Sequence, residues 1–163
     1  MSTRCRIGIM DEDGAVVSIY CHHDGYPSHV GRMLRDHYGD EPKVRRLMEL
    51  GDVSSLGTEP VANPNAWADQ DLFDPKKNWF EEFKRLHPEN MCDAYSTRGE
   101  NVPAIRHANE DEFVKDTFGC WGEYAYLFKG GEWLVYGAYD KETGNQFGWV
   151  AVGDALKKEK EDE

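Results

Sequence analysis

Hydrophobic and polar residues alternate over residues 3–10, where Cys5 and Ile7 share one face. Residues 15–21 form a second run, rich in β-branched and aromatic side chains, after an Asp-Glu-Asp-Gly sequence typical of a turn. A period of two is the pattern of β-strands. The chain therefore predicts an amino-terminal β-hairpin, across which Cys5 and Cys21 can face each other as a thiol pair rather than a disulfide.

Helical spacing follows this hairpin. Val30, Leu34 and Tyr38 recur every four residues and predict a helix that begins near Pro27. Residues 40–51 predict a second helix, because an aspartate can cap its start and a glycine can end it.

Two further helices are expected later in the chain. An Asp-Pro pair at residues 74–75 can open a helix, and Trp79, Phe83 and Leu86 belong to the apolar stripe that follows it. Residues 110–118 predict a short helix behind an asparagine cap.

The last third of the chain carries the clearest strand pattern. Aromatic residues alternate over residues 124–128, and a Gly-Gly pair leads into a second run over residues 132–139. A turn at residues 140–145 and a third run at residues 147–152 complete an antiparallel meander. We expect the hairpin and the meander to form one antiparallel β-sheet with short helices packed on one face.

These elements predict the α+β fold class. A length of 163 residues suits one domain. We expect a single α+β domain over residues 1–156 and a charged, frayed tail over residues 157–163, where lysine and acidic residues alternate.

The chain is strongly acidic, because 19 lysines and arginines oppose 31 aspartates and glutamates and give a net charge of −12. This charge argues against direct binding of nucleic acid and favours a basic partner. The acidic residues expected to contact that partner lie in the carboxy-terminal half: Glu110, Asp111, Glu112 and Asp116. Four cysteines outside any CxxC pair, no signal peptide and no long apolar run predict a cytoplasmic protein that does not contact a membrane.

The densest polar group is the sequence Cys-His-His-Asp-Gly-Tyr-Pro, residues 21–27. His22 and Asp24 would point to one side of a strand, where they could act as a base and its partner or share a metal ion. His23 and Tyr26 could line a ligand pocket beside them. The alternative is structural: Asp-Gly makes the turn, and the proline fixes the entry to the helix.

The arginines offer a second candidate site. Arg4 and Arg6 share a strand face, and Arg98 lies near a tyrosine on a loop, so they could bind a nucleotide or another phosphorylated ligand. The alternative is surface charge that balances the acidic residues. The sequence contains no HExxH or CxxC motif, phosphate loop or nucleophile elbow. We therefore assign no catalytic residue, no metal ion and no cofactor.

Several segments of the first 57 or so residues resemble small proteins of bacteriophages, prophages and other mobile elements. These are Thr-Arg-Cys at residues 3–5, Tyr-Cys-His-His-Asp-Gly-Tyr-Pro at residues 20–27, Val-Gly at residues 30–31 and Leu-Gly-Asp-Val-Ser-Ser-Leu at residues 50–56. Many such proteins carry His-Trp-Asp-Gly-Tyr-Pro, so His23 stands where they have tryptophan. The aromatic carboxy-terminal strands fit loosely. The resemblance implies a phage or mobile-element context and supplies no catalytic residues.

Three functions follow as hypotheses. The first is an accessory protein that binds and inhibits a host protein or complex, such as a nucleic-acid-binding defence protein, in the manner of an anti-CRISPR. The second is a sponge for a nucleotide signal. The third is a metal-assisted hydrolase or nuclease that uses His22 and Asp24.

Overall fold

The structure is a computed structural model that describes the backbone of residues 2–67, 74–137 and 148–161. Its centre is the predicted hairpin of β1 (Cys5–Met10) and β2 (Val16–Cys21). The two strands pair antiparallel, with Cys5 opposite Cys21, and both cysteines are free thiols. The expected hairpin and its thiol pair are confirmed.

The carboxy-terminal meander is also confirmed. Strands β6 (Tyr124–Lys129), β7 (Glu132–Tyr136) and β8 (Val150–Ala151) pair antiparallel in chain order. The turn expected at residues 140–145 lies outside the described residues.

The expectation of a purely antiparallel sheet is wrong, because β1 pairs parallel with β6. A helix, residues 110–119, lies between β5 and β6 in the chain. After this helix, the amide of Glu123 donates to the carbonyl of Arg4 at 2.7 Å. This contact places the start of β6 beside the start of β1, so the two strands run in the same direction. The fold class is α+β, with a mixed sheet in the order β4-β3-β2-β1-β6-β7-β8.

Three short strands complete the edge beside β2. Strand β3 (Val53–Ser55) pairs parallel with β2, β4 (Asp93–Ala94) pairs with β3, and β5 (Ile105–His107) pairs with the first half of β2. Between β3 and β5 the Asp52 carboxylate accepts the Tyr20 amide at 2.8 Å, in place of a strand partner. Burial raises the pKa of this carboxyl group.

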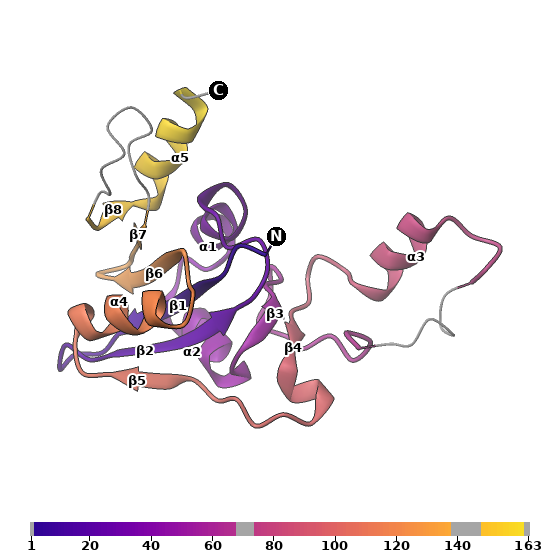
Figure 1. The fold of residues 1–163 in the computed structure, drawn as a ribbon, viewed down its shortest axis with the longest axis horizontal. Coiled ribbons are helices and arrows are strands. Elements are labelled where there is room, and N and C mark those ends of the chain that lie inside the picture. The colour runs from indigo at the N-terminus through magenta and orange to yellow at the C-terminus, as the bar shows by residue number, and fades with distance from the viewer. Residues whose placement is uncertain (1, 68–73, 138–147, 162–163) are drawn as a thin grey trace.

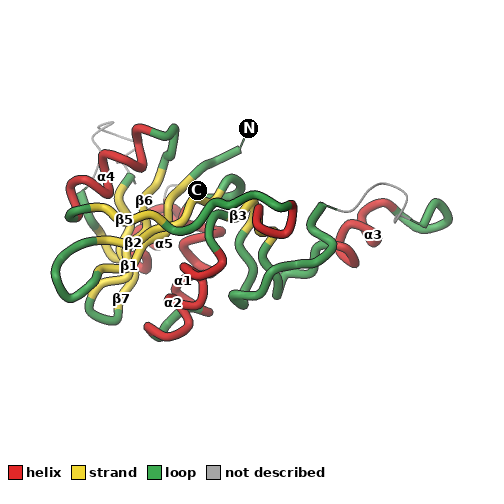
Figure 2. The backbone as a smooth tube through the Cα atoms, turned by 90° about the horizontal axis from the view of Figure 1, so that it is seen from below, coloured by secondary structure: helices red, strands yellow, loops and turns green. Residues whose placement is uncertain are grey.

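Helices cover both faces of the sheet, so the expectation of one covered face is wrong (Figure 2). One face carries the π-helical turn η1 (Pro27–Gly31), α1 (Arg32–His37), α2 (Glu41–Leu50) and α5 (Val152–Glu161). Its buried core includes these residues: Cys5, Ile7, Ile9, Ile19, Cys21, Val30, Leu34, Val44, Leu47 and Tyr126.

The opposite face is covered by α4 (Glu110–Gly119). Phe113 of this helix packs on Val16, Ala125 and Leu127, which point away from the main core. Alternation along each strand sends apolar side chains to both faces, so each face needs a cover.

Helix α3 (Trp79–Leu86) stands apart from these layers and projects from the edge beyond β4 (Figure 1). Its N-cap is Asn78, whose carboxamide oxygen accepts the Phe80 amide at 2.7 Å, so the helix begins later than the expected Asp-Pro pair. The carboxy-terminal end of α3 contacts the rest of the protein, because Leu86 is buried and its carbonyl accepts a hydrogen bond from the Asn63 carboxamide at 2.6 Å.

Candidate functional site

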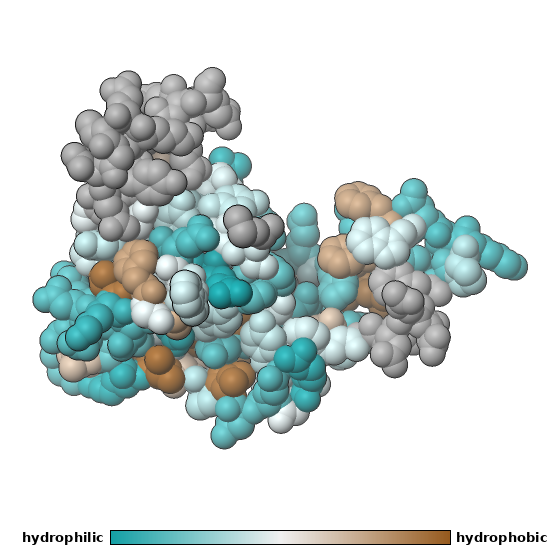
Figure 3. All heavy atoms as spheres, in the orientation of Figure 1, coloured by the Kyte–Doolittle hydropathy of each residue, from teal (hydrophilic) through white to brown (hydrophobic). Residues whose placement is uncertain are grey.

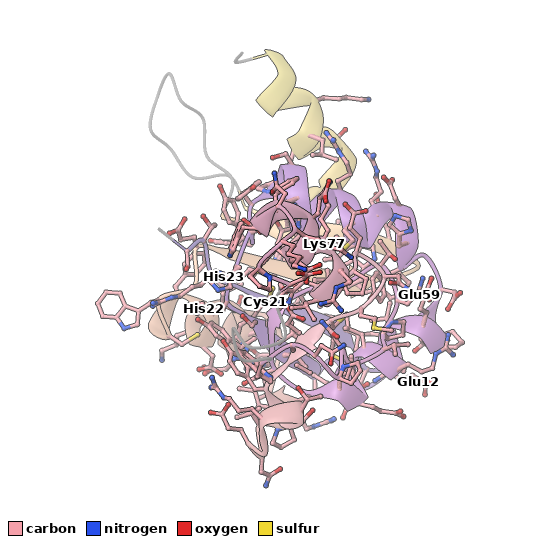
Figure 4. All side chains as sticks on the ribbon, turned by 90° about the vertical axis from the view of Figure 1, so that its right-hand side faces the viewer. Glu12, Cys21, His22, His23, Glu59 and Lys77 are labelled. Atoms are coloured by element: carbon pink, nitrogen blue, oxygen red, sulfur yellow. The ribbon has the colours of Figure 1, made fainter. Side chains whose placement is uncertain are left out.

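The Cys-His-His-Asp-Gly-Tyr-Pro sequence is built into the backbone of the sheet edge. The amides of His22 and His23 donate to the carbonyls of Val53 and Ser54 at 3.1 and 2.9 Å. Figure 4 views this region from the side of α3, with Cys21, His22 and His23 labelled at the end of β2. The start of the motif therefore extends the hydrogen-bonded pairing of β2 with β3, and the chain then turns toward η1.

The turn itself needs its two residue types. Asp24 has a φ of +58°, a left-handed conformation that aspartate tolerates better than most residues. A Cβ on Gly25 would lie 2.8 Å from the Thr3 carbonyl oxygen and 2.9 Å from the Cys5 Cβ. The Gly25 carbonyl accepts the buried Tyr126 hydroxyl at 2.7 Å. The structural interpretation of Asp-Gly is thus supported by direct contacts.

The two histidines are engaged locally. Nδ1 of His22 lies 2.7 Å from the Tyr20 hydroxyl, Nδ1 of His23 lies 3.1 Å from the Ser2 hydroxyl, and the two rings meet edge to face. Burial, the neighbouring His23 and Arg4 lower the pKa of His22. Asp24 makes no hydrogen bond with His22 among the described residues, because the left-handed turn ends the strand alternation between them.

The amino-terminal arginines, which the sequence analysis places on one strand face, have different environments. Arg6 is 6% exposed, and its Nε donates to the Ser18 hydroxyl at 2.8 Å. Its side chain is therefore part of the protein interior and not of a surface site. Arg4 is half-buried and acts electrostatically on Tyr20 and His22.

The Arg6 contact belongs to a buried chain of polar groups that the sequence analysis missed. The Ser18 hydroxyl lies 2.7 Å from Nε2 of His107, and Nδ1 of the same ring lies 2.7 Å from an Asp116 carboxylate oxygen. The order matches a Ser-His-Asp relay. However, Ser18 is completely buried beneath α4 and its oxygen already accepts from Arg6, so this network links β1, β2, β5 and α4 as a structural unit. No sequence spacing could have indicated it.

Arg98 is the last residue of the short helix η3 (Tyr95–Arg98), and its side chain contacts groups of the same protein. Its guanidinium carbon lies 4.4 Å from the centre of the Trp67 ring and 5.3 Å from that of Tyr95, and Nη2 donates to Glu100 at 2.7 Å. The arginine expected near an aromatic ring thus stacks on two rings within the protein.

The four acidic residues expected at a partner surface differ in their contacts. Glu110 accepts Lys129 at 2.7 Å, and Asp116 holds His107. Asp111 and Glu112 are exposed, with no ion-pair partner among the described residues. All four lie on α4. The negative charges of the first three stabilise the helix, because they lie in its first turn, beside the positive end of the helix dipole.

The most exposed apolar side chains of α3 form a surface of their own. Trp79, Phe80 and Phe83 are 66%, 58% and 40% exposed. The Trp79 and Phe83 rings stack 5.3 Å apart, and Phe83 lies 4.5 Å from the His87 ring that follows the helix. We name Trp79, Phe83 and His87 the aromatic row. Figure 3 shows brown, hydrophobic side chains gathered on the projecting part of the molecule that contains α3.

This row runs into a groove of about 380 Å³ between the end of α3, the start of α1 and the loop after β3. Phe83 and His87 line it from α3 and the residue after it, and Asp24 and Arg32 line it from the motif and the start of α1. His87 is held by the Asp93 carboxylate at 3.0 Å, which also accepts the Ser55 hydroxyl at 3.0 Å. The groove thus joins the motif residue Asp24 to α3, which is distant in the sequence.

No group of three or more histidine, cysteine or acidic residues among the described residues has the geometry to hold a metal ion. No helix of the described chain is long and apolar enough to cross a membrane. No family model, curated protein or solved structure matches this chain.

Proposed function

We propose that this chain is an anti-defence protein of a phage or mobile element, which binds a host protein through α3 and inhibits it. The observation that carries the proposal is the exposure of Trp79, Phe80 and Phe83 on one projecting helix. Exposed clusters of large rings mark interaction sites, and tryptophan is enriched among the residues that dominate binding energy. A helix that offers anchors one turn apart suits insertion into a groove of a partner.

Two further features support inhibition by binding. The resemblance of the first third of the chain to phage and mobile-element proteins suggests a host component as the target. The net charge of −12 would attract a basic, nucleic-acid-binding target and speed its association.

The two other hypotheses have less support. A hydrolase that uses His22 and Asp24 would need their side chains together, whereas His22 bonds to Tyr20 and Asp24 lines the groove. A nucleotide sponge would need a basic pocket, but the groove beside the motif has four acidic residues against one arginine and three histidines.

The test is a plaque assay in bacterial strains that each carry one defined defence system. We expect expression of the chain to restore plaques of a targeted phage in at least one strain. The Trp79→Ala/Phe83→Ala variant should lose this protection, whereas Trp121→Ala, which removes a tryptophan that is 79% exposed elsewhere, should retain it. Failure to protect in every strain, or full protection by the α3 variant, would overturn the proposal.

A further inference from the structure

His87 belongs both to the aromatic row and to a network of hydrogen bonds. It is the C-cap residue of α3, and the centre of its ring lies 4.5 Å from that of Phe83 at an interplanar angle of 30°. Its Nδ1 lies 3.0 Å from Oδ2 of Asp93. The ring contact and the hydrogen bond together fix the plane and the direction of the imidazole ring.

The Asp93 carboxylate is itself held by two further donors. Its Oδ2 accepts the Ser55 hydroxyl and its Oδ1 accepts the Asn63 carboxamide nitrogen, both at 3.0 Å. The Asn63 side chain has only one possible orientation, because its oxygen accepts the Asn65 amide at 2.9 Å and its nitrogen must then face Asp93. Ser55 belongs to β3 and Asn63 is buried, so the carboxylate is fixed by separate segments of the chain.

These contacts determine which nitrogen of His87 carries the proton. An ionised carboxylate can only accept hydrogen bonds, so Nδ1 is the donor to Asp93. In the neutral imidazole, Nε2 is then an acceptor with a free lone pair. Nε2 has no hydrogen-bond partner among the described residues, and no buried polar side-chain atom of this part of the chain lacks a partner. Nε2 is therefore accessible at the surface, on a residue that lines the groove together with Phe83.

An oriented acceptor beside exposed rings is suited to recognise one donor of a partner. The rings of Trp79 and Phe83 offer apolar area, which contributes affinity but little direction. A partner without an N–H or O–H group at the position of Nε2 would bury this atom without a hydrogen bond, which costs free energy. His87 can thus discriminate between partners that cover the two rings equally well.

We infer that His87 selects the partner of the α3 surface: its Nε2 accepts a hydrogen bond from an N–H or O–H group that lies next to the apolar segment covering Trp79 and Phe83. Asp93 is a positioning residue, because it holds His87 in the tautomer that leaves Nε2 as the acceptor. The inference rests on the proposed function for the existence of a protein partner. It adds the polar group that this partner must present.

The tautomer is tested first, and without a partner, by NMR of protein labelled with 15N in its histidine rings. At pH 8, where ordinary histidine side chains are neutral, the signals missing from His87→Phe identify residue 87. We expect a protonated Nδ1 and an unprotonated Nε2. Asp93→Asn should reverse this pattern, because a carboxamide NH2 group can donate to Nδ1. Asp36→Asn, in the same groove but paired with Arg35, should leave it unchanged. A protonated Nε2 in the wild-type protein would overturn the inference.

The second measurement counts plaques in a protected strain while the amount of expressed protein is varied. His87→Phe keeps a ring against Phe83 but removes Nε2, so we expect it to need about tenfold more protein for equal protection, the affinity change for one lost hydrogen bond. Asp93→Asn, which keeps the size of the side chain, should need a similar increase, and Asp36→Asn should stay within about twofold. Amide hydrogen exchange along α3 shows whether each variant keeps the helix.

Full protection by His87→Phe and Asp93→Asn at wild-type amounts would show that His87 does not meet the partner, and only the inference fails. Weaker protection by Asp93→Asn with an unchanged tautomer would overturn the positioning role. If α3 exchanges faster in His87→Phe, Asp93→Asn alone decides in the same way. Absence of protection by the wild-type chain in every strain overturns the proposed function instead, whichever tautomer is found.

Discussion

Gly25 is the residue at which the motif is most sensitive to substitution. The Thr3 carbonyl and the Cys5 side chain occupy the position of an added Cβ, at 2.8 and 2.9 Å. We expect Gly25→Ala to lower the free energy of unfolding by about 1–3 kcal/mol, the usual cost of forcing an extra methyl group into a packed site. Urea unfolding measures it, and Gly39→Ala, at a position with open space around it, is the control. Equal stability of the two variants would show that the motif turn is not tightly packed.

Ser18 tests whether the buried polar network is structural. Ser18→Ala removes the group that Arg6 and His107 share and leaves both without that bond in the interior. We expect a loss of about 1–3 kcal/mol in the free energy of unfolding, the cost of leaving a buried polar group unsatisfied. Ser96→Ala, an exposed serine, should change it by less than about 0.5 kcal/mol.

A second measurement separates structure from catalysis at the same residue. A fluorophosphonate probe labels serine nucleophiles in Ser-His-Asp sites. Complete burial of Ser18 predicts no labelling of the folded protein. Labelling of Ser18 would instead mean that α4 opens and that the relay performs acyl transfer.

At the scale of elements, one buried carboxylate of α3 holds the segment that precedes the helix. Glu82 is 2% exposed, accepts Arg85 at 2.7 Å and accepts the Asp74 amide at 3.0 Å. The hydrogen bond from Arg85, then that from Asp74, lowers the pKa of Glu82 from its ordinary value of 4.5 to about 2. A lowered carboxyl pKa stabilises the folded form above the ordinary value, and that contribution is lost as the pH falls through the folded-state pKa.

We therefore expect the first turn of α3 to loosen between pH 4.5 and about 2. Amide hydrogen exchange along α3, compared with that of α4, reports this loss. Glu82→Gln should remove the pH dependence, whereas Glu81→Gln, an exposed neighbour on the same helix, should keep it. An unchanged pH profile in Glu82→Gln would assign the loosening to another group.

Periodicity predicted the elements best where they are long. The hairpin, the first two strands of the meander and the second and fourth helices all have enough residues for a period to be read, and Asp40 and Asn109 cap those helices as expected. Strands β3, β4 and β5 have two or three residues each, too few for a pattern. The apolar stripe of α3 predicted a helix correctly, but a stripe cannot reveal what covers it, and here most of it faces solvent.

At the scale of the whole molecule, the fold controls which thiols can react. Cys5, Cys21 and Cys92 are buried, and burial raises the pKa of Cys5 and raises that of Cys92 to about 11. Cys120 is partly exposed. We expect Ellman's reagent to titrate one thiol rapidly in the native protein and all four after denaturation. A second fast thiol that disappears in Cys5→Ser would contradict the packing of β1 against β2.

Contacts between segments that are distant in the chain could not be predicted from the sequence. The parallel pairing of β1 with β6 joins strands separated by more than half the chain, and the groove joins Asp24 to Phe83. The polar cluster at residues 21–27 is visible in the sequence, but only the fold divides it between a backbone turn and one groove residue. The acidic residues on α4 were equally visible, but two of the four are engaged within the protein.

Site-specific photo-crosslinking in protected cells shows whether α3 contacts the partner. Benzoylphenylalanine would replace Trp79 in one protein and Trp121, the exposed tryptophan beside α4, in another. We predict a single crosslinked host protein from position 79, displaced by excess wild-type chain but not by Phe83→Ala, and no such product from position 121. A specific product from position 121 alone, or none from position 79 in cells that the variant still protects, would show that α3 does not contact the partner.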